Sequence, residues 1–170
     1  MSDERRCLEL YKRIRLLIWI VILGLWFSGL TAFFLETELR FAAQVYGLQA
    51  FEREEEFSGF PYWLIRIRNG LSHTNSQYPF IAYGTDWLAF AHLSLAVLFL
   101  GILRDPVRNL WVLTFGLIAC ISIFPLAFIC GELRGIPLYW KLTDCSFGVG
   151  GFVPLWYARK YCLELEHNKE

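Results

Sequence analysis

The feature that most constrains this chain is a run of twenty residues without a charge, from Leu16 to Leu35. As a helix rising about 1.5 Å per residue, it covers the roughly 30 Å hydrocarbon core of a bilayer. Arg13 and Arg15 precede the run, and Glu36 and Glu38 follow it. The run is too long for the apolar part of a signal peptide, and no small-residue cleavage site ends it. It predicts a first membrane span that is retained.

Two further apolar runs, Trp87–Leu103 and Leu110–Gly131, predict the second and third spans. Only Arg104–Asn109 separates them, so we expect a tight turn and an antiparallel helical hairpin. Pro106 cannot continue the preceding helix without losing a hydrogen bond. Asn109 is a suitable N-cap for the helix that follows.

A fourth run, Cys145–Ala158, is only fourteen residues long and contains three glycines and a proline. This composition favours a helix packed closely against its neighbours, where glycines let backbones approach. Ser146 and Gly150 are small residues four apart, as are Gly24 and Ser28 in the first run, and pairing between these two motifs is one possibility. Together the four runs predict an all-α membrane protein, a four-transmembrane-helix bundle in a single domain over residues 1–170.

Lysine and arginine predict the orientation. The N-terminal tail, the Arg104–Asn109 turn and the C-terminal tail carry ten of the sixteen, and the remaining loops carry six over about twice as many residues. Because positive residues stay on the cytoplasmic side, both termini are expected there. The net charge of zero gives no support to nucleic-acid binding.

The segment Glu36–Gly84 is expected on the outer side. Apolar residues recur at helical spacing over residues 39–51, and a second short helix is predicted to begin at Pro61. Both are too short and too charged to span. They are predicted either to lie flat in the interface as amphipathic helices or to form a small cap on the bundle. Ser72–Pro79 is predicted to be a polar loop.

Two histidines are candidates for a haem or metal site. His92 lies six positions into the second span, where ionisable residues are costly and mark functional sites. The alternative is a neutral histidine bonded to a backbone carbonyl. His73, in the predicted polar loop, is the candidate second ligand, and simple solvation is its alternative.

Asp86 and Asp144 each follow a threonine where a span is predicted to begin from the outer side. Capping of the helix N-terminus explains both positions. The other interpretation is a polar mouth at the outer face that receives a cation, a proton or a headgroup. Its candidate residues are Asp86, His92, Asp144, Glu132, Arg134 and Glu36.

The five cysteines fall at different predicted positions relative to the membrane. Cys7 and Cys162 are expected as cytoplasmic thiols, and Cys120 as a packed apolar residue. Cys130 and Cys145 fall at outer helix ends, where a disulfide and free packed thiols are both open. The sequence contains no Cys-x-x-Cys, Walker, His-Glu-x-x-His or Gly-x-Ser-x-Gly motif.

Five stretches carry a family resemblance: Leu30–Phe33 (LTAF), Tyr83–Leu93 (YGTDWLAFAHL), Arg104–Asn109 (RDPVRN), Arg134–Pro137 (RGIP) and Asp144–Gly148 (DCSFG). In them the chain resembles an uncharacterised family of bacterial four-helix inner-membrane proteins. The resemblance implies a bacterial plasma membrane and carries no activity.

The function expected from the sequence is a non-enzymatic membrane subunit or binding protein that holds a partner protein, a lipid or a quinone at its outer face. The second hypothesis is a haem- or metal-binding protein that uses His92 and His73. The third is an intramembrane enzyme that uses Asp86, His92 and Asp144 on a lipid-like substrate.

Overall fold

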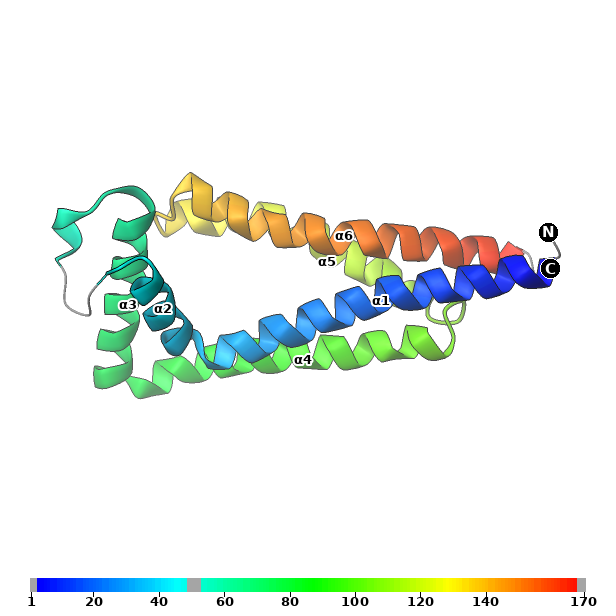
Figure 1. Ribbon diagram of the computed structural model, residues 1–170, viewed down its shortest axis with the longest axis horizontal. Helices are drawn as coiled ribbons and strands as arrows, with labels where there is room; N and C mark the ends of the chain where they lie inside the picture. Colours follow the sequence, from blue (N-terminus) through cyan, green and yellow to red (C-terminus); the bar gives the residue numbers. More distant parts are fainter. Residues whose placement is uncertain (1–2, 49–52, 168–170) are drawn as a thin grey trace. The chain divides into compact units, whose positions relative to one another are not determined.

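The computed structural model describes residues 3–48 and 53–167, and these residues are mostly helical, without a strand. The all-α prediction is confirmed. The six α-helices in Figure 1 are α1 (Asp3–Phe33), α2 (Leu35–Val45), α3 (Gly59–Gln77), α4 (Tyr83–Arg104), α5 (Leu110–Leu133) and α6 (Leu138–His167). Two short 3₁₀ helices, η1 (Glu54–Glu56) and η2 (Pro79–Ala82), precede α3 and α4.

Three stretches of the described chain are long and apolar enough to cross a membrane: Glu4–Phe33, Pro79–Arg104 and Leu110–Leu133. They contain the first three predicted spans almost completely. The 30-residue helix α6 is not among them. Its uncharged part, Cys145–Ala158, is shorter than the roughly 20 apolar residues of a typical span. The fourth span therefore stays a prediction.

The helices α1 and α6 extend well beyond the uncharged runs that predicted them. Residues 3–15 contain no glycine or proline and consist mostly of good helix formers. Polar contacts also hold the extended ends together. Arg6 Nε donates to Glu164 Oε1 at 3.1 Å, and the Arg13 guanidinium lies over the Tyr161 ring at 5.8 Å. Tertiary contacts thus continue both helices past their apolar stretches.

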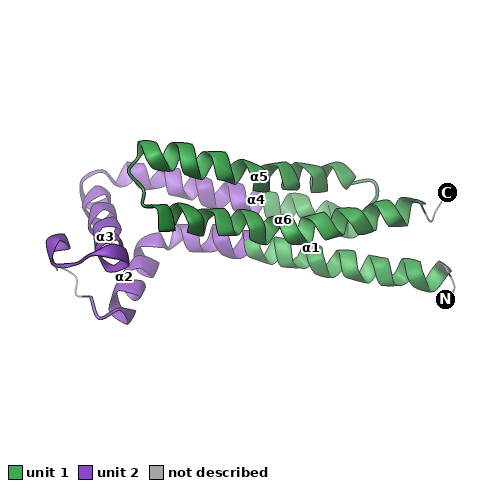
Figure 2. Ribbon diagram, turned by 90° about the horizontal axis from the view of Figure 1, so that it is seen from above, with its two compact units in different colours: residues 1–24, 95–170 green, residues 25–94 purple. Residues whose placement is uncertain are grey.

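The chain divides into two compact units, coloured in Figure 2, where the sequence predicted one domain. Unit 1 comprises residues 1–24 and 95–170, and unit 2 comprises residues 25–94. The boundaries fall inside α1 and α4, so these helices contribute residues to both units.

In unit 1, α5 and α6 pack as an antiparallel pair at close range. A Cβ added to Gly148 would meet the backbone oxygen of Cys120 at 2.9 Å, and one added to Gly116 would meet Leu155 Cδ1 at 2.9 Å. Arg159 Nε donates to Thr114 Oγ1 at 3.2 Å further along. The predicted role of the α6 glycines in close packing is confirmed.

The pairing of small-residue motifs between the first and fourth spans, which the sequence left as one possibility, does not form. A Cβ added to Gly24 or to Gly150 would meet nothing within 4 Å. The glycines that face a neighbour on α6 are Gly148 and Gly151, one turn apart, and both approach Cys120 on α5. Helix rotation decides which small residues meet, and spacing alone does not give that rotation.

The turn between α4 and α5 forms as predicted, but Asn109 acts differently. Asn109 occupies the N-cap position of α5 without a side-chain cap bond. Its Nδ2 instead donates to the Gly101 oxygen at 3.0 Å and to the Asp105 oxygen at 2.8 Å. Gly101 belongs to the last turn of α4 and Asp105 directly follows that helix, and each of these carbonyls also accepts a backbone N–H. Asn109 therefore closes α4 and not α5.

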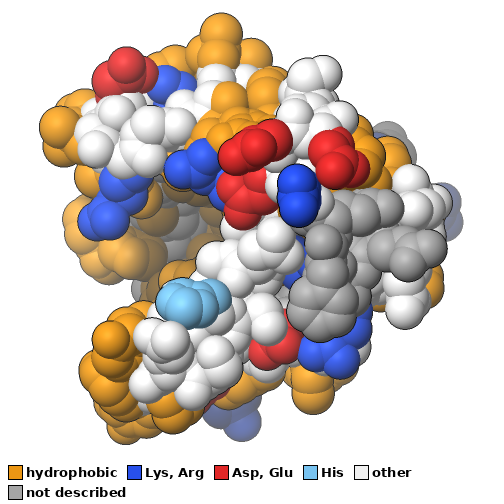
Figure 3. Space-filling view, turned by 90° about the vertical axis from the view of Figure 1, so that its left-hand side faces the viewer, with side chains coloured by type: hydrophobic (Ala, Val, Ile, Leu, Met, Phe, Trp, Pro, Cys, Tyr) orange, Lys and Arg blue, Asp and Glu red, His pale blue; other side chains and the backbone are white. Residues whose placement is uncertain are grey.

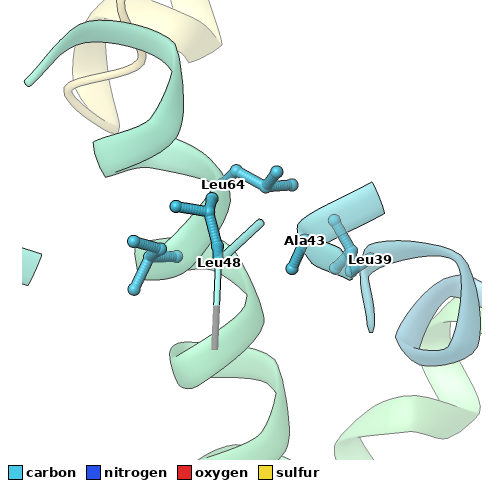
Figure 4. Packing of buried hydrophobic residues seen from close by; sticks show 5 residues of the cluster. Leu39, Ala43, Leu48 and Leu64 are labelled. Atoms are coloured by element: carbon cyan, nitrogen blue, oxygen red, sulfur yellow. The ribbon is translucent and has the colours of Figure 1, made fainter. Parts of the chain in front are cut away.

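Unit 2 contains a small core where α2 packs on α3. Leu39 and Ala43 of α2 lie against Leu64 and Ile65 of α3, with Leu48 from the segment after α2 (Figure 4). The predicted helix over residues 39–51 begins earlier, at Leu35, and ends at Val45, where Gly47 takes a positive φ of 71°. Residues 49–51 of that prediction lie outside the described residues.

The polar loop predicted over Ser72–Pro79 is mostly helical, because α3 continues to Gln77. Ser76 Oγ donates to the His73 oxygen at 2.9 Å, and Asn75 Nδ2 donates to Glu36 Oε2 at 3.0 Å. A bond to α2 thus holds a polar sequence in the helix until Pro79 begins η2. Figure 3 shows hydrophobic, acidic and basic side chains exposed side by side on one face.

Candidate binding groove between α5 and α6

An open groove of about 240 Å³ lies between the end of α5 and the start of α6. It is lined by Ile123, Leu126, Ala127, Cys130, Gly131, Arg134, Ile136 and Asp144. Six of these are apolar or small residues, and two are charged. The walls are therefore suited to a hydrocarbon chain, and the charges to a polar group at its end.

The groove exists because the chain reverses sharply after α5. The Ile136 N–H donates to the Gly131 oxygen at 2.9 Å, and the Gly135 N–H donates to the Glu132 oxygen at 3.1 Å. With Gly135 at a φ of 66°, this is a Schellman motif, which ends a helix with a left-handed glycine. Arg134 is the C-cap, so the motif fixes its position at the groove.

The two charged residues of the groove have no partner within the described part of the chain. Arg134 is exposed and Asp144 is half-buried, and neither side chain forms an ion pair or a hydrogen bond in residues 3–48 and 53–167. A half-buried carboxylate without a partner is costly, since it loses hydration without compensation. Both groups are therefore available to a ligand.

Glu132, another residue of the predicted mouth, is occupied. It accepts a hydrogen bond from Lys141 Nζ at 2.6 Å. The Lys141 side chain is only 8% exposed, because its methylene groups lie across Gly131, and Glu132 is 79% exposed. Lys141 was not among the candidate residues predicted from the sequence. The sequence held only a weak signal for this ion pair, namely that Glu132 and Lys141 carry opposite charges on either side of a predicted turn.

Neither aspartate is the N-cap residue of its helix, but Asp86 lies in the first turn of α4, where a negative charge suits the helix N-terminus. Helix α4 begins at Tyr83, so Asp86 lies inside its first turn, and Thr85 Oγ1 donates to the Ala82 oxygen at 2.6 Å. Helix α6 begins at Leu138, so Asp144 is its seventh residue. Both helices therefore start earlier than the apolar runs that predicted them.

His92 is half-buried in α4 and faces the first helix. A Cβ added to Gly29 of α1 would meet His92 Cβ at 3.1 Å and the Ala89 oxygen at 3.0 Å. Its Nδ1 lies 2.8 Å from the Leu88 oxygen, which can only accept, so Nδ1 carries the proton. This is the carbonyl-bonded histidine of the alternative interpretation. The bond leaves Nε2 available as an acceptor or ligand.

His73 lies exposed on α3 and not in a loop. Within the described residues there is no group of three or more His, Cys, Asp or Glu side chains that is arranged to hold a metal ion.

Glu36 has a structural role in unit 2. The hydrogen bond from Asn75, and after it the Arg40 guanidinium at 2.9 Å, lower the pKa of Glu36 below its ordinary value despite partial burial. The carboxylate therefore stays ionised and joins α2 to α3.

All five cysteines are free thiols in the structure. Cys145 and Cys162 are buried, and the others are half-buried. Of the two possibilities left open for Cys130 and Cys145, the structure has the free packed thiols.

The predicted site residues divide between the units. Glu132, Arg134 and Asp144 lie in unit 1 around one groove, whereas Glu36, His73, Asp86 and His92 lie in unit 2. No protein-family model, curated protein or solved structure matches the chain. The resemblance to bacterial inner-membrane proteins therefore stays a prediction.

Proposed function

We propose that this protein is an integral membrane binding protein that holds an amphipathic molecule, a lipid or a quinone, in the groove between α5 and α6. The observation that carries the proposal is the combination of apolar walls with Arg134 and Asp144, two charged groups free of partners within the described chain. Ligand sites typically combine apolar walls with a few placed polar groups.

The size of the groove supports a membrane ligand over a water-soluble one. Its volume of about 240 Å³ lies below the roughly 300–1,000 Å³ of pockets that enclose a whole small molecule. The groove belongs to the C-terminal half of α5, one of the three candidate spans. A chain segment and a headgroup fit such a site, and the rest of the ligand remains in the bilayer.

We further propose four spans, with α6 as the fourth, in a bacterial inner membrane with both termini in the cytoplasm. The excess of lysine and arginine at the termini and at the α4–α5 turn supports this orientation. Helices α2 and α3 then lie at the outer interface. In support, α2 buries Leu39 against α3 and leaves Phe41 and Val45 67% and 68% exposed, as a membrane-facing surface requires.

The test compares two aliphatic residues of α5 whose side chains are almost equally exposed. Leu126 lines the groove and is 62% exposed, and Ile129 does not line it and is 61% exposed. The wild-type protein, purified in mild detergent, should retain a lipid or quinone detectable by mass spectrometry. Leu126→Trp should reduce that occupancy at least several-fold, and Ile129→Trp should not. Wild-type protein without any bound amphiphile, even after reconstitution with lipid and quinone, would contradict the proposal.

His92 supports a second candidate function, the binding of haem. Metal-ligating histidines usually donate their other ring N–H to a carbonyl or carboxylate, as His92 Nδ1 does to Leu88. Protein from haem-replete cells should then show a Soret band that His92→Ala removes. Loss of the band in His73→Ala as well would identify the second ligand. A colourless wild-type preparation would dismiss this candidate.

A further inference from the structure

The charges at the groove allow the ligand class to be narrowed. Four charged side chains lie at this end of the α5–α6 pair: Glu132, Arg134, Lys141 and Asp144. Glu132 and Lys141 neutralise each other in an ion pair of 2.6 Å. Arg134 and Asp144 are not joined by an ion pair, and both line the groove. Among the described residues, the rim thus offers one free cation, Arg134, and one free anion, Asp144.

We infer that the groove selects a zwitterionic aminophospholipid, with the phosphate at Arg134 and the ammonium group at Asp144. This inference rests on the proposed function and deepens it. The guanidinium is planar and presents paired N–H donors that match two phosphate oxygens. The carboxylate accepts hydrogen bonds and carries the charge that an ammonium group complements.

The net charge of the rim argues against the other common headgroups. Sites that bind anionic lipids are clusters of basic residues, and here Arg134 is balanced by Asp144. A phosphatidylglycerol headgroup would leave the carboxylate without a cation. A phosphatidylcholine headgroup carries the positive charge but has no N–H to donate. A quinone has neither charge. Phosphatidylethanolamine supplies an anion, a cation and N–H donors together.

The half-burial of Asp144 strengthens the argument for an ammonium group. An ion pair between exposed groups contributes little, because water screens it. Asp144 is less exposed to water than such groups, because it is half-buried on α6 and next to the buried Cys145. Bound acyl chains cover it further, so the pairing with the ammonium group becomes the discriminating contact between lipids.

The experiment measures lipid binding to delipidated full-length protein by native mass spectrometry. The lipids are phosphatidylethanolamine, phosphatidylglycerol and phosphatidylcholine with identical acyl chains, together with a ubiquinone. Wild-type protein should bind phosphatidylethanolamine about tenfold more tightly than each of the others. Asp144→Asn should remove this preference and leave phosphatidylcholine binding unchanged. Arg134→Gln should weaken all three phospholipids, and Arg108→Gln, an exposed arginine in the α4–α5 turn, should weaken none.

The outcomes separate the inference from the function beneath it. Equal binding of the three phospholipids, or binding of the ubiquinone alone, would overturn the inference if Leu126→Trp still reduces the occupancy. Binding that neither Leu126→Trp nor the charge variants affect would overturn the proposed function as well.

Discussion

Gly148 and Gly150 are two residues apart on α6 and meet very different surroundings. A Cβ on Gly148 would contact the backbone oxygen of Cys120 at 2.9 Å, and one on Gly150 would contact nothing within 4 Å. A backbone atom cannot move aside as the end of a flexible side chain can. The close approach of α5 and α6 therefore depends on Gly148. From the sequence alone, both glycines would be expected to allow close packing.

Gly148→Ala should destabilise the protein by about 1–3 kcal/mol, the usual cost of overpacking a close-packed contact. Gly150→Ala is the matched control and should be neutral or stabilising by up to roughly 1 kcal/mol, since alanine is the better helix former. Thermal or denaturant unfolding in the same detergent measures both. Equal effects of the two variants would mean that α5 and α6 do not approach at Gly148.

Cys162 is expected to be unreactive in the folded protein. Its side chain is fully buried, and burial raises the pKa of the thiol to about 12, so almost no thiolate exists at neutral pH. Maleimide labelling of the native protein at pH 7 should spare Cys162, with site assignment by peptide mass spectrometry. After denaturation without reductant, all five cysteines should react. A cysteine that requires reductant would reveal a bridge.

At the scale of elements, the contact between α2 and α3 combines a small apolar core with one polar bond. Leu39 and Ala43 supply the apolar part, and the bond from Asn75 to Glu36 joins the start of α2 to the last turns of α3. This bond explains why the polar sequence after Ser72 is helical. It also makes the α2–α3 contact sensitive to the charge of Glu36.

Because the pKa of Glu36 is lower in the folded state, its carboxylate stabilises the fold above the ordinary pKa of the side chain. That contribution is lost as the pH falls through the lowered value. Glu36→Gln should therefore lower the hydrogen-exchange protection of α2 and of residues 72–77 at pH 7. The wild-type protein should approach the variant only as the pH falls below the ordinary pKa of a glutamate. Glu38→Gln is the control, since the exposed Glu38 forms no ion pair in the described chain, and equal behaviour of both variants would contradict the assignment.

At the scale of the whole molecule, the number of spans decides where the ends of the chain lie. Three spans place the two termini on opposite sides of the membrane, and four spans place them on the same side. The helix α6 is 30 residues long, which at about 1.5 Å per residue exceeds the thickness of the hydrocarbon core. Its length thus permits a span, and its short uncharged part leaves it outside the three candidates.

Reporter fusions test the proposed topology. A fusion after His167 should report the cytoplasm, and an insertion at Ser58, between η1 and α3, should report the outer side. The physical reason is the positive charge at both termini and at the α4–α5 turn. A reporter at the N-terminus serves as the third point. If the two termini report opposite sides, α6 does not span and the four-span topology is wrong.

The sequence by itself determined the helical class and the position of the three long apolar helices. Those properties follow from long uncharged runs and sharp charge boundaries, which act locally and can be read along the chain. The sequence also indicated that Arg134 and Asp144 belong at one end of a helix pair. Tertiary structure alone decided that they line a groove, that Lys141 neutralises Glu132, and that Gly148 rather than Gly150 faces α5. It also extended α3 through the polar residues 72–77. These outcomes depend on helix rotation and on contacts between residues distant in sequence, which a linear pattern of hydrophobicity and charge does not encode.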